Sequence, residues 1–453
     1  MTTVAKINIP DLLANSKLGP LQKRVFMLCL MTLIIDGFDV QAMGFLIPAL
    51  SAAWNVEPAQ FRTVLPAANF GVLIGSLLLS PVADKIGRRP ILVWSTLWFA
   101  VMTLGAAFAQ NVDQLFWLRL VAGVGMGCII PNATALIGEY SPAARRVTLM
   151  MTITVGFTAG GAIAGFVARA LIPAFGWQSV FIVGGAIPLV IAVAMFAALP
   201  ESLQFLAVRR RRLDQVARWL TQLDPTIKVD ASTEYVANEE SKGGVTFVHL
   251  FRDKRSLVTV LLWIVNFMNL LNLYSVSSWL PTVVNGMGYD QNTSVLVGTV
   301  LWVGGTIGTF GLAWAISRSG FTRTLMFNYV VAAIAIAFIG HPGISLMMLT
   351  VIVFVTGWCV VGGQPGMNAF AATFYPTYLR STGVGWALGI GRVGAIVGPY
   401  IGGRMIGAHW TSQQLFWAAA VPAVISACTL LVLMRVTRDN ASLAAARTAP
   451  AGH

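Results

Sequence analysis

Charged residues are scarce in this chain of 453 residues. Lys, Arg, Asp and Glu together account for 10% of it, whereas a soluble domain carries about 25%. Hydrophobic residues account for 57%, and they gather in continuous runs of about twenty residues, the length that an α-helix needs to cross a bilayer. Continuous runs exclude a β-barrel, whose strands alternate apolar and polar residues. The composition therefore predicts an integral, all-α polytopic membrane protein.

Cysteine and histidine are equally sparse, with four residues of each type. The cysteines stand singly in apolar runs without CxxC spacing, which predicts neither a disulfide framework nor a metal site. The sequence has no P-loop, Ser/His/Asp pattern or paired-His pattern, so we expect no ATP coupling, no catalytic residues and no cofactor. The polar residues before the first apolar run do not resemble a signal peptide, and no cleaved signal is expected.

Twelve apolar segments are predicted to span the membrane. They are 24–50, 60–83, 91–109, 114–138, 147–171, 177–199, 257–283, 291–316, 323–340, 344–370, 380–406 and 413–436. A long polar stretch, 200–256, separates the sixth span from the seventh. We therefore predict an N-terminal six-helix bundle over 1–199, a cytoplasmic linker over 200–256, and a C-terminal six-helix bundle with a short tail over 257–453.

Basic residues concentrate on one side of this topology. That side holds both termini and the linker, and its Lys and Arg residues outside the linker are Lys6, Lys17, Lys23, Arg24, Lys85, Arg88, Arg89, Arg145, Arg146, Arg318, Arg380, Arg438 and Arg447. The opposite loops contribute Arg62 and little else. Cytoplasmic loops carry an excess of Lys and Arg, so we expect both termini in the cytoplasm and the protein in a bacterial inner membrane. The net charge of +13 then sets orientation and does not indicate nucleic-acid binding.

The linker contains one clear amphipathic pattern. In SLQFLAVRRRRLDQVARWLTQL (202–223), apolar residues recur at near-helical spacing with arginines on the other face. This pattern favours a helix that lies on the membrane surface, and binding of anionic lipid is the functional alternative. The segment FVHLFRDKRS (247–256) predicts a second short helix.

The two halves of the chain repeat each other. DGFDVQAMGFLIP in the first span aligns with NLLNLYSVSSWLP in the seventh, at a constant offset of 233 that places Asp36 on Asn269 and Asp39 on Asn272. Later, NATALIGEYSPAARR matches NAFAATFYPTYLRS, with Tyr140 on Tyr375. Six spans repeated in parallel order predict two pseudo-symmetric six-helix bundles and a transport site between them.

Several motifs resemble those of the major facilitator superfamily. SPVADKIGRRP (80–90) resembles the superfamily's loop between spans 2 and 3, RLVAGVGMG (119–127) its span-4 motif, and GRVGAIVGPYIGG (391–403) its Gly/Pro-rich helix. Within the superfamily, DGFD in span 1 is similar to the aromatic acid:proton symporters, which import compounds such as 4-hydroxybenzoate, protocatechuate and benzoate. The resemblance implies a transporter of that class, driven by the proton-motive force.

Four charged residues are predicted to lie at one depth in the bilayer. At 1.5 Å per residue, Asp36 and Asp39 lie about 18 and 22 Å from the cytoplasmic start of span 1. Arg119, in antiparallel span 4, lies about 22 Å from the cytoplasm, and Arg392 lies about 18 Å into span 11. Charge at that depth is costly, so a functional cluster is expected.

This cluster suggests proton coupling and substrate binding. We expect Asp36 or Asp39 to carry the coupled proton with Arg119 as its switchable partner, because burial and a nearby guanidinium shift a carboxyl pKa in opposite directions. Arg392 would receive the substrate carboxylate, since its planar fork suits that group. The structural alternative is a permanent buried ion pair between spans 1 and 4.

Amide and aromatic side chains supply further candidates for the substrate site. Asn266, Asn269 and Asn272 in span 7, and Gln364 and Asn368 in span 10, would hydrogen-bond a ring hydroxyl, and contacts between helices are the alternative. Trp279, Trp358 and Trp386 could stack on an aromatic ring, but tryptophan is also common at membrane interfaces, so a lipid-facing or interfacial position is expected for any single one of them.

Gating is expected at the cytoplasmic ends of the helices. Asp84, Arg88 and Arg89 in the loop between spans 2 and 3 would contact Glu139, which also lies near Arg145 and Arg146 in sequence. Such contacts would form in one state and break in the other, and a plain surface ion pair is the alternative.

The sequence as a whole predicts a monomeric proton symporter that imports an aromatic carboxylate by alternating access. The partners are the small aromatic acid, protons and the lipid bilayer. Transport of another organic acid, such as muconate or a dicarboxylate, and drug:proton antiport remain open. A membrane sensor and a membrane enzyme are disfavoured, since no signalling domain or catalytic pattern is present.

Overall fold

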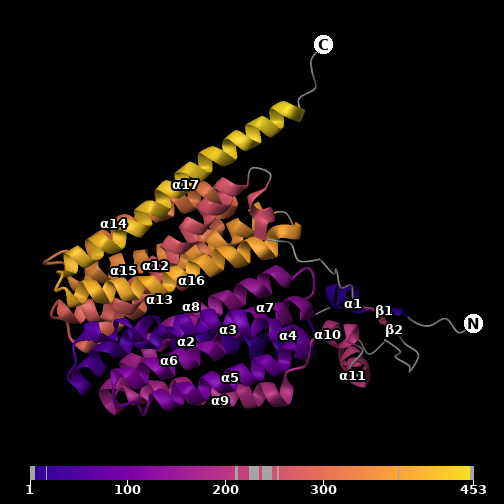
Figure 1. Ribbon diagram of the computed structural model, residues 1–453, viewed down its shortest axis with the longest axis horizontal. Helices are drawn as coiled ribbons and strands as arrows, with labels where there is room; N and C mark the ends of the chain where they lie inside the picture. Colours follow the sequence, from indigo (N-terminus) through magenta and orange to yellow (C-terminus); the bar gives the residue numbers. More distant parts are fainter. Residues whose placement is uncertain are drawn as a thin grey trace, which may run out of the picture. The chain divides into compact units, whose positions relative to one another are not determined.

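The computed structural model describes residues 6–16, 18–209, 213–223, 234–236, 247–252, 255–375 and 377–448. Twelve helical segments are long and apolar enough to cross a membrane (Figure 1). They are α2 (Pro20–Trp54), η1 (Pro58–Arg62) with α3 (Val64–Leu78), α5 (Arg88–Ala106), α6 (Val112–Met126) with α7 (Ile129–Tyr140), α8 (Arg146–Phe175), α9 (Gln178–Ala198), α12 (Ser256–Gly286), α13 (Gln291–Ser319), α14 (Phe321–Ile339), α15 (Leu346–Phe374), α16 (Thr377–Gly407) and α17 (Ser412–Thr448). The predicted all-α fold with twelve spans is confirmed.

The remaining elements are short. They are β1 (Lys6–Asn8), α1 (Ile9–Asn15), α4 (Ser80–Ile86), α10 (Leu203–Val208), α11 (Leu213–Leu223), β2 (Glu234–Val236) and η2 (Phe247–Phe251). The hydropathy pattern did not predict the pairing of β1 with β2, which form a parallel two-stranded sheet with Ile7 opposite Tyr235.

The fourth span is interrupted where the sequence predicted one continuous helix. Helix α6 ends at Met126 and α7 begins at Ile129. Pro131 lies in the first turn of α7, where a missing N–H does no harm. Inside a continuous helix, however, its ring would clash with the carbonyl of Gly127, four residues earlier. The break therefore follows from the position of the proline.

The chain divides into two compact units. The first unit comprises 1–40, 67–161 and 174–241, and the second comprises 41–66, 162–173 and 242–453. In the first unit, α5 packs against α6 and α9. In the second unit, the principal helix pairs are α13 with α15, α12 with α16, and α14 with α17. The predicted bundle boundaries at 199 and 257 stay predictions.

Helix α11 does not expose its apolar face as predicted. Val216 and Leu220 are fully buried, in one hydrophobic cluster with Leu206 of α10. Tyr235 of β2 packs against the same cluster. The interpretation as a membrane-surface helix is therefore wrong for Val216 and Leu220, which protein covers, whereas Leu213 of the same helix is 39% exposed. The arginines at 210–212 lie outside the described residues.

Close helix packing in the second unit depends on glycine. At Gly357 of α15, a Cβ atom would overlap the backbone carbonyl of Leu301 in α13. Small residues allow membrane helices to approach at the backbone, which is where van der Waals packing stabilises them in lipid. The contact between α13 and α15 therefore tolerates no side chain at position 357.

We predict that Gly357→Ala lowers the stability of the protein by about 1–3 kcal/mol, because overpacking forces the two backbones apart. The measurement is the thermal unfolding midpoint in detergent micelles. Gly385→Ala in α16 is the matched control, because it also replaces a glycine inside a helix with alanine. A Cβ atom at position 385 meets nothing within 4 Å. An unchanged midpoint for Gly357→Ala would show that α13 and α15 do not meet as described.

Candidate functional site

The first unit contains an ion pair that is almost completely buried. Asp39 of α2 and Arg119 of α6 are each 1% exposed, and Arg119 Nη1 donates to Asp39 Oδ1 at 2.9 Å. Arg119 Nη2 also donates to the backbone oxygen of Asp39 at 3.0 Å, and Thr103 Oγ1 donates to Asp39 Oδ1 at 2.9 Å. The prediction left open which aspartate meets Arg119, and this pairing involves Asp39. Asp36, one turn earlier, is also buried.

The ion pair has unused hydrogen-bonding capacity. Asp39 Oδ2 and Arg119 Nε are buried, and neither makes a hydrogen bond to any residue that the structure describes. An unsatisfied oxygen on a buried carboxylate is costly. The pair therefore leaves one acceptor and one donor without a partner among the described residues.

A second arginine, Arg392, lies in the second unit. It is half-buried at the middle of α16, fifteen residues from each end of that helix. Among the described residues it has no hydrogen-bond or ion-pair partner. A guanidinium at membrane depth is costly unless an anion neutralises it. Arg392 is therefore suited to receive a carboxylate.

Four of the five predicted amide residues form one network between α12 and α15. Asn269 Nδ2 donates to Gln364 Oε1 at 2.5 Å, and Gln364 Nε2 donates to Asn266 Oδ1 at 3.2 Å and to Asn368 Oδ1 at 3.0 Å. Asn269 Oδ1 is buried without a hydrogen-bond donor in the described chain. The network thus bonds two helices together and keeps one acceptor available.

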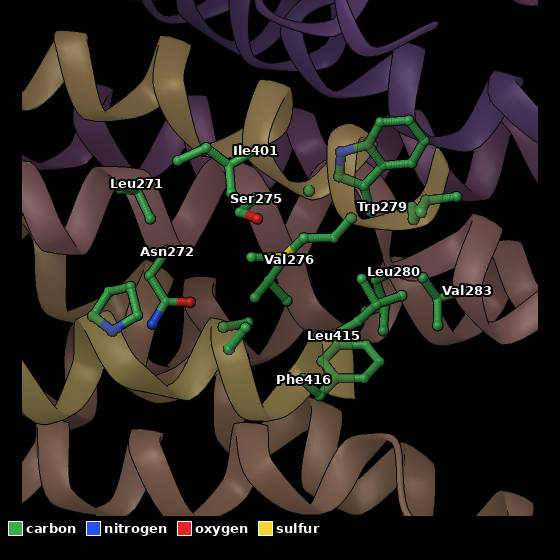
Figure 2. A pocket seen from close by; sticks show the side chains of 17 residues that line it. Leu271, Asn272, Ser275, Val276, Trp279, Leu280, Val283, Ile401, Leu415 and Phe416 are labelled. Carbon is green, nitrogen blue, oxygen red and sulfur yellow. The ribbon is translucent and has the colours of Figure 1, made fainter. Parts of the chain in front are cut away.

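The fifth amide lies apart from this network. Asn272 lines a pocket together with Trp279 (Figure 2). Trp279 is 4% exposed, so the expectation of a lipid-facing or interfacial position is wrong for this residue. Trp358 packs beside α13 at Gly308, while Trp386 is 43% exposed and stacks on Trp263 with ring centroids 6.0 Å apart.

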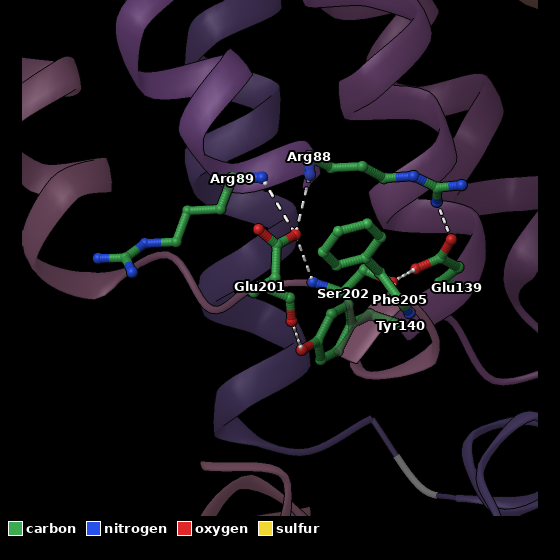
Figure 3. A network of polar contacts seen from close by, with 7 residues as sticks. All are labelled: Arg88, Arg89, Glu139, Tyr140, Glu201, Ser202 and Phe205. Atoms are coloured by element: carbon green, nitrogen blue, oxygen red, sulfur yellow. Dashed lines mark hydrogen bonds and ion pairs between the residues drawn. The ribbon is translucent and has the colours of Figure 1, made fainter. Parts of the chain in front are cut away.

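The predicted gating residues are only partly brought together. Arg88 forms an ion pair with Glu139, and the Ser202 hydroxyl also donates to Glu139 (Figure 3). Among the described residues, neither Arg145 nor Arg146 forms an ion pair with Glu139: Arg145 is exposed, and Arg146 donates to the backbone oxygen of Ser141 at 3.4 Å. The side chain of Asp84 lies outside the described residues.

Sequence reasoning missed Glu201, which caps the start of α5. Its Oε1 accepts hydrogen bonds from the backbone N–H groups of Arg88 at 2.9 Å, Arg89 at 3.2 Å and Ser202 at 2.8 Å. A carboxylate is favourable at a helix N-terminus, where N–H groups lack partners. The Glu201 carboxylate occupies the space that a Cβ on Gly87 would need, and Gly87 has a φ of 109°.

Glu201 also forms a hydrogen bond with the C-terminal residue of α7. Tyr140 donates from its hydroxyl to the Glu201 backbone oxygen at 2.7 Å. Burial raises the pKa of the Glu201 carboxyl above its ordinary value, and the hydrogen bonds from the backbone and the Arg89 guanidinium oppose this shift. The segment PES (200–202) was the available signal, but the sequence does not show that its acid reaches residues 112 and 113 positions earlier.

Comparison with known proteins identifies the family. The family model described as Major Facilitator Superfamily matches residues 29–354. The chain belongs to this superfamily. It is 35% identical over 437 residues to the 4-hydroxybenzoate transporter PcaK of Pseudomonas putida, which covers 96% of this chain and 98% of that protein. It is also 34% identical to a gallate transporter of the same organism, over 94% of this chain and 95% of the relative.

A solved structure supports the fold. The crystal structure of a bacterial homolog of the human lysosomal transporter Spinster matches with a TM-score of 0.72 and 16% identity, over 92% of this chain and 97% of that chain. The superfamily and its transporter relatives make the protein a multi-pass membrane transporter and not an enzyme.

We predict that Glu201 makes stability decrease as pH rises. Because its folded-state pKa lies above the ordinary value of 4.5, its contribution is fully present below pH 4.5 and is lost as pH rises through the folded-state pKa. Between pH 4.5 and 8, the unfolding midpoint should therefore fall more for the wild type than for Glu201→Gln. Glu57→Gln, at an exposed carboxylate, should behave as the wild type. Equal pH profiles for the wild type and Glu201→Gln would contradict the prediction.

Proposed function

We propose that this protein is a proton-coupled symporter that imports aromatic carboxylates across a bacterial inner membrane by alternating access. The observation that carries the proposal is Arg392, a cation at the middle of a membrane helix with no anionic partner among the described residues. Relatives named for 4-hydroxybenzoate and gallate transport support the aromatic acid as its ligand. Both termini and the linker would lie in the cytoplasm, and the protein would act as a monomer.

In this proposal the substrate is held by charge and by amides. Arg392 binds the carboxylate through two parallel hydrogen bonds, which are stronger and more directional than contacts to a neutral donor. Asn269 offers a free acceptor to a ring hydroxyl, supported by Asn266, Gln364 and Asn368. Trp358 and Trp386 would contribute less, because each has its contacts elsewhere. Asn272 would contribute less because it lies apart from the amide network and lines a separate pocket.

The proton is carried by Asp39 of the first unit, with Asp36 as an accessory acid. In the charged form Arg119 holds Asp39, and protonation of Oδ2 releases that attraction. The proton-motive force then supplies the driving energy without a cofactor. Because protonation is required for transport, uptake should rise as external pH falls and should collapse when a protonophore removes the gradient.

Gating in this proposal uses the Arg88–Glu139 ion pair at the inner ends of α5 and α7, with Asp84 and Arg89 in the same loop region. The side chains of Arg88 and Glu139 are 25% and 13% exposed. An ion pair with that exposure is weak, so it can form and break during each transport cycle. Arg145 and Arg146 could replace Arg88 as partners in another state.

We predict different losses for the two sites in proteoliposomes. Asp39→Asn should abolish the gradient-driven accumulation of radiolabelled 4-hydroxybenzoate but keep exchange of internal for external substrate, because the neutral amide mimics the protonated acid. Arg392→Ala should abolish both activities, since the substrate carboxylate loses its partner. Arg392→Lys keeps the charge but not the planar fork, so its KM should rise by at least about tenfold, or about 1.4 kcal/mol.

Gly385→Ala serves as a control that touches neither site. Gradient-driven accumulation of 4-hydroxybenzoate by Asp39→Asn would contradict proton coupling. The same holds if the wild type only equilibrates 4-hydroxybenzoate across the membrane. Unchanged uptake by Arg392→Ala would contradict the substrate site. Accumulation of muconate or a dicarboxylate without accumulation of 4-hydroxybenzoate would redirect the proposal to another acid.

A further inference from the structure

A pocket in the second unit is separate from Arg392 and the amide network that are proposed to hold the substrate, although Asn272 lines it. It lies among α12, α16 and α17, close to the turn that joins α16 to α17, and contains about 570 Å³ of unfilled space, counted with its open mouth. No charged side chain lines it, and neither Arg392 nor the amide network does so. Its walls are aliphatic and aromatic, with Trp279 and Phe416 toward one end and Asn272 at the other (Figure 2).

Asn272 is the unusual member of this pocket. Its side chain is 2% exposed, and both amide atoms, Nδ2 and Oδ1, lack a hydrogen-bond partner in the part of the chain that the structure describes. Burying an amide in this state is unfavourable. Trp279 cannot satisfy it, because its indole N–H already donates to the Pro399 backbone oxygen at 2.7 Å. A ligand that carries both a hydrogen-bond donor and a hydrogen-bond acceptor would satisfy both atoms of the Asn272 amide.

The internal repeat explains why no described residue provides a partner for Asn272. Asn272 corresponds to Asp39, which is bonded to Arg119 in the first unit. At the offset of 235 that relates Tyr140 to Tyr375, the position equivalent to Arg119 is Phe354. The second half of the chain thus keeps a polar side chain at this place and lacks the cation that would bind it.

We propose that this pocket binds a small uncharged aromatic compound that carries a donor and an acceptor on one group, namely an aromatic amide or an undissociated aromatic acid. Such a group pairs with the Asn272 carboxamide through two reciprocal hydrogen bonds, and Ser275 adds a hydroxyl one turn further along α12. The ring packs between the aromatic walls. A carboxylate anion is excluded, because no cation lines the pocket and burial of an unpaired charge is costly.

The test is the binding of radiolabelled benzamide to the full-length protein in lipid nanodiscs, with empty nanodiscs measuring partition into lipid. The wild type should bind benzamide saturably. Asn272→Leu, which keeps the volume and removes both hydrogen bonds, should weaken binding by at least about tenfold. Ala419→Trp, which fills the pocket from α17 without changing Asn272, should abolish it. Thermal unfolding of each variant verifies that it is folded, and Asn272→Leu should be no less stable than the wild type.

Arg392→Ala separates this pocket from the proposed transport site. It should bind benzamide as the wild type does even though its uptake of 4-hydroxybenzoate is lost, so the two proposals can fail independently. Equal binding by the wild type and Asn272→Leu, no binding above partition into lipid, or displacement of benzamide by 4-hydroxybenzoate at neutral pH would overturn the proposal.

Discussion

The cost of placing charge in a hydrocarbon layer is the constraint on which the rest of this structure depends. The protein meets that cost in different ways in its two units. In the first, Asp39 and Arg119 neutralise each other, and the Thr103 hydroxyl donates a further hydrogen bond to Asp39. In the second, Arg392 has no such partner among the described residues. This difference is the physical basis of the proposal that a substrate anion accompanies Arg392 during part of the transport cycle.

The internal repeat places different polar residues at equivalent positions of the two halves. Equivalent positions carry Asp36 and Asp39 in the first half and Asn269 and Asn272 in the second. An acid can gain and lose a proton, whereas an amide offers fixed donors and acceptors at any pH. The proposed function therefore assigns the proton to the acids of the first unit and recognition of the substrate to the amides of the second.

The parts of the molecule that follow from spacing and hydropathy were predictable. Each of the twelve spans follows from its apolar length, and helical rise alone placed Asp39 and Arg119 at one depth. Rise per residue does not determine which of two neighbouring acids faces an arginine. The burial of Val216 in α11 and the cap by Glu201 depend on how chain segments far apart in sequence fold against each other. No local pattern encodes those contacts, and the functional roles of the site residues stay predictions.

The Arg88–Glu139 and Asp39–Arg119 ion pairs differ in the way they can be broken. Arg88 and Glu139 retain contact with water, so separating them exchanges a weak attraction for hydration and needs little free energy. Asp39 and Arg119 have no water to replace their partner, and separation of the charged pair would leave two uncompensated charges in the interior. In the proposed mechanism, a proton on Asp39 would remove one of those charges beforehand. The proposal therefore has the exposed pair open in every cycle and the buried pair open only after a proton has bound, which is the condition that coupling requires.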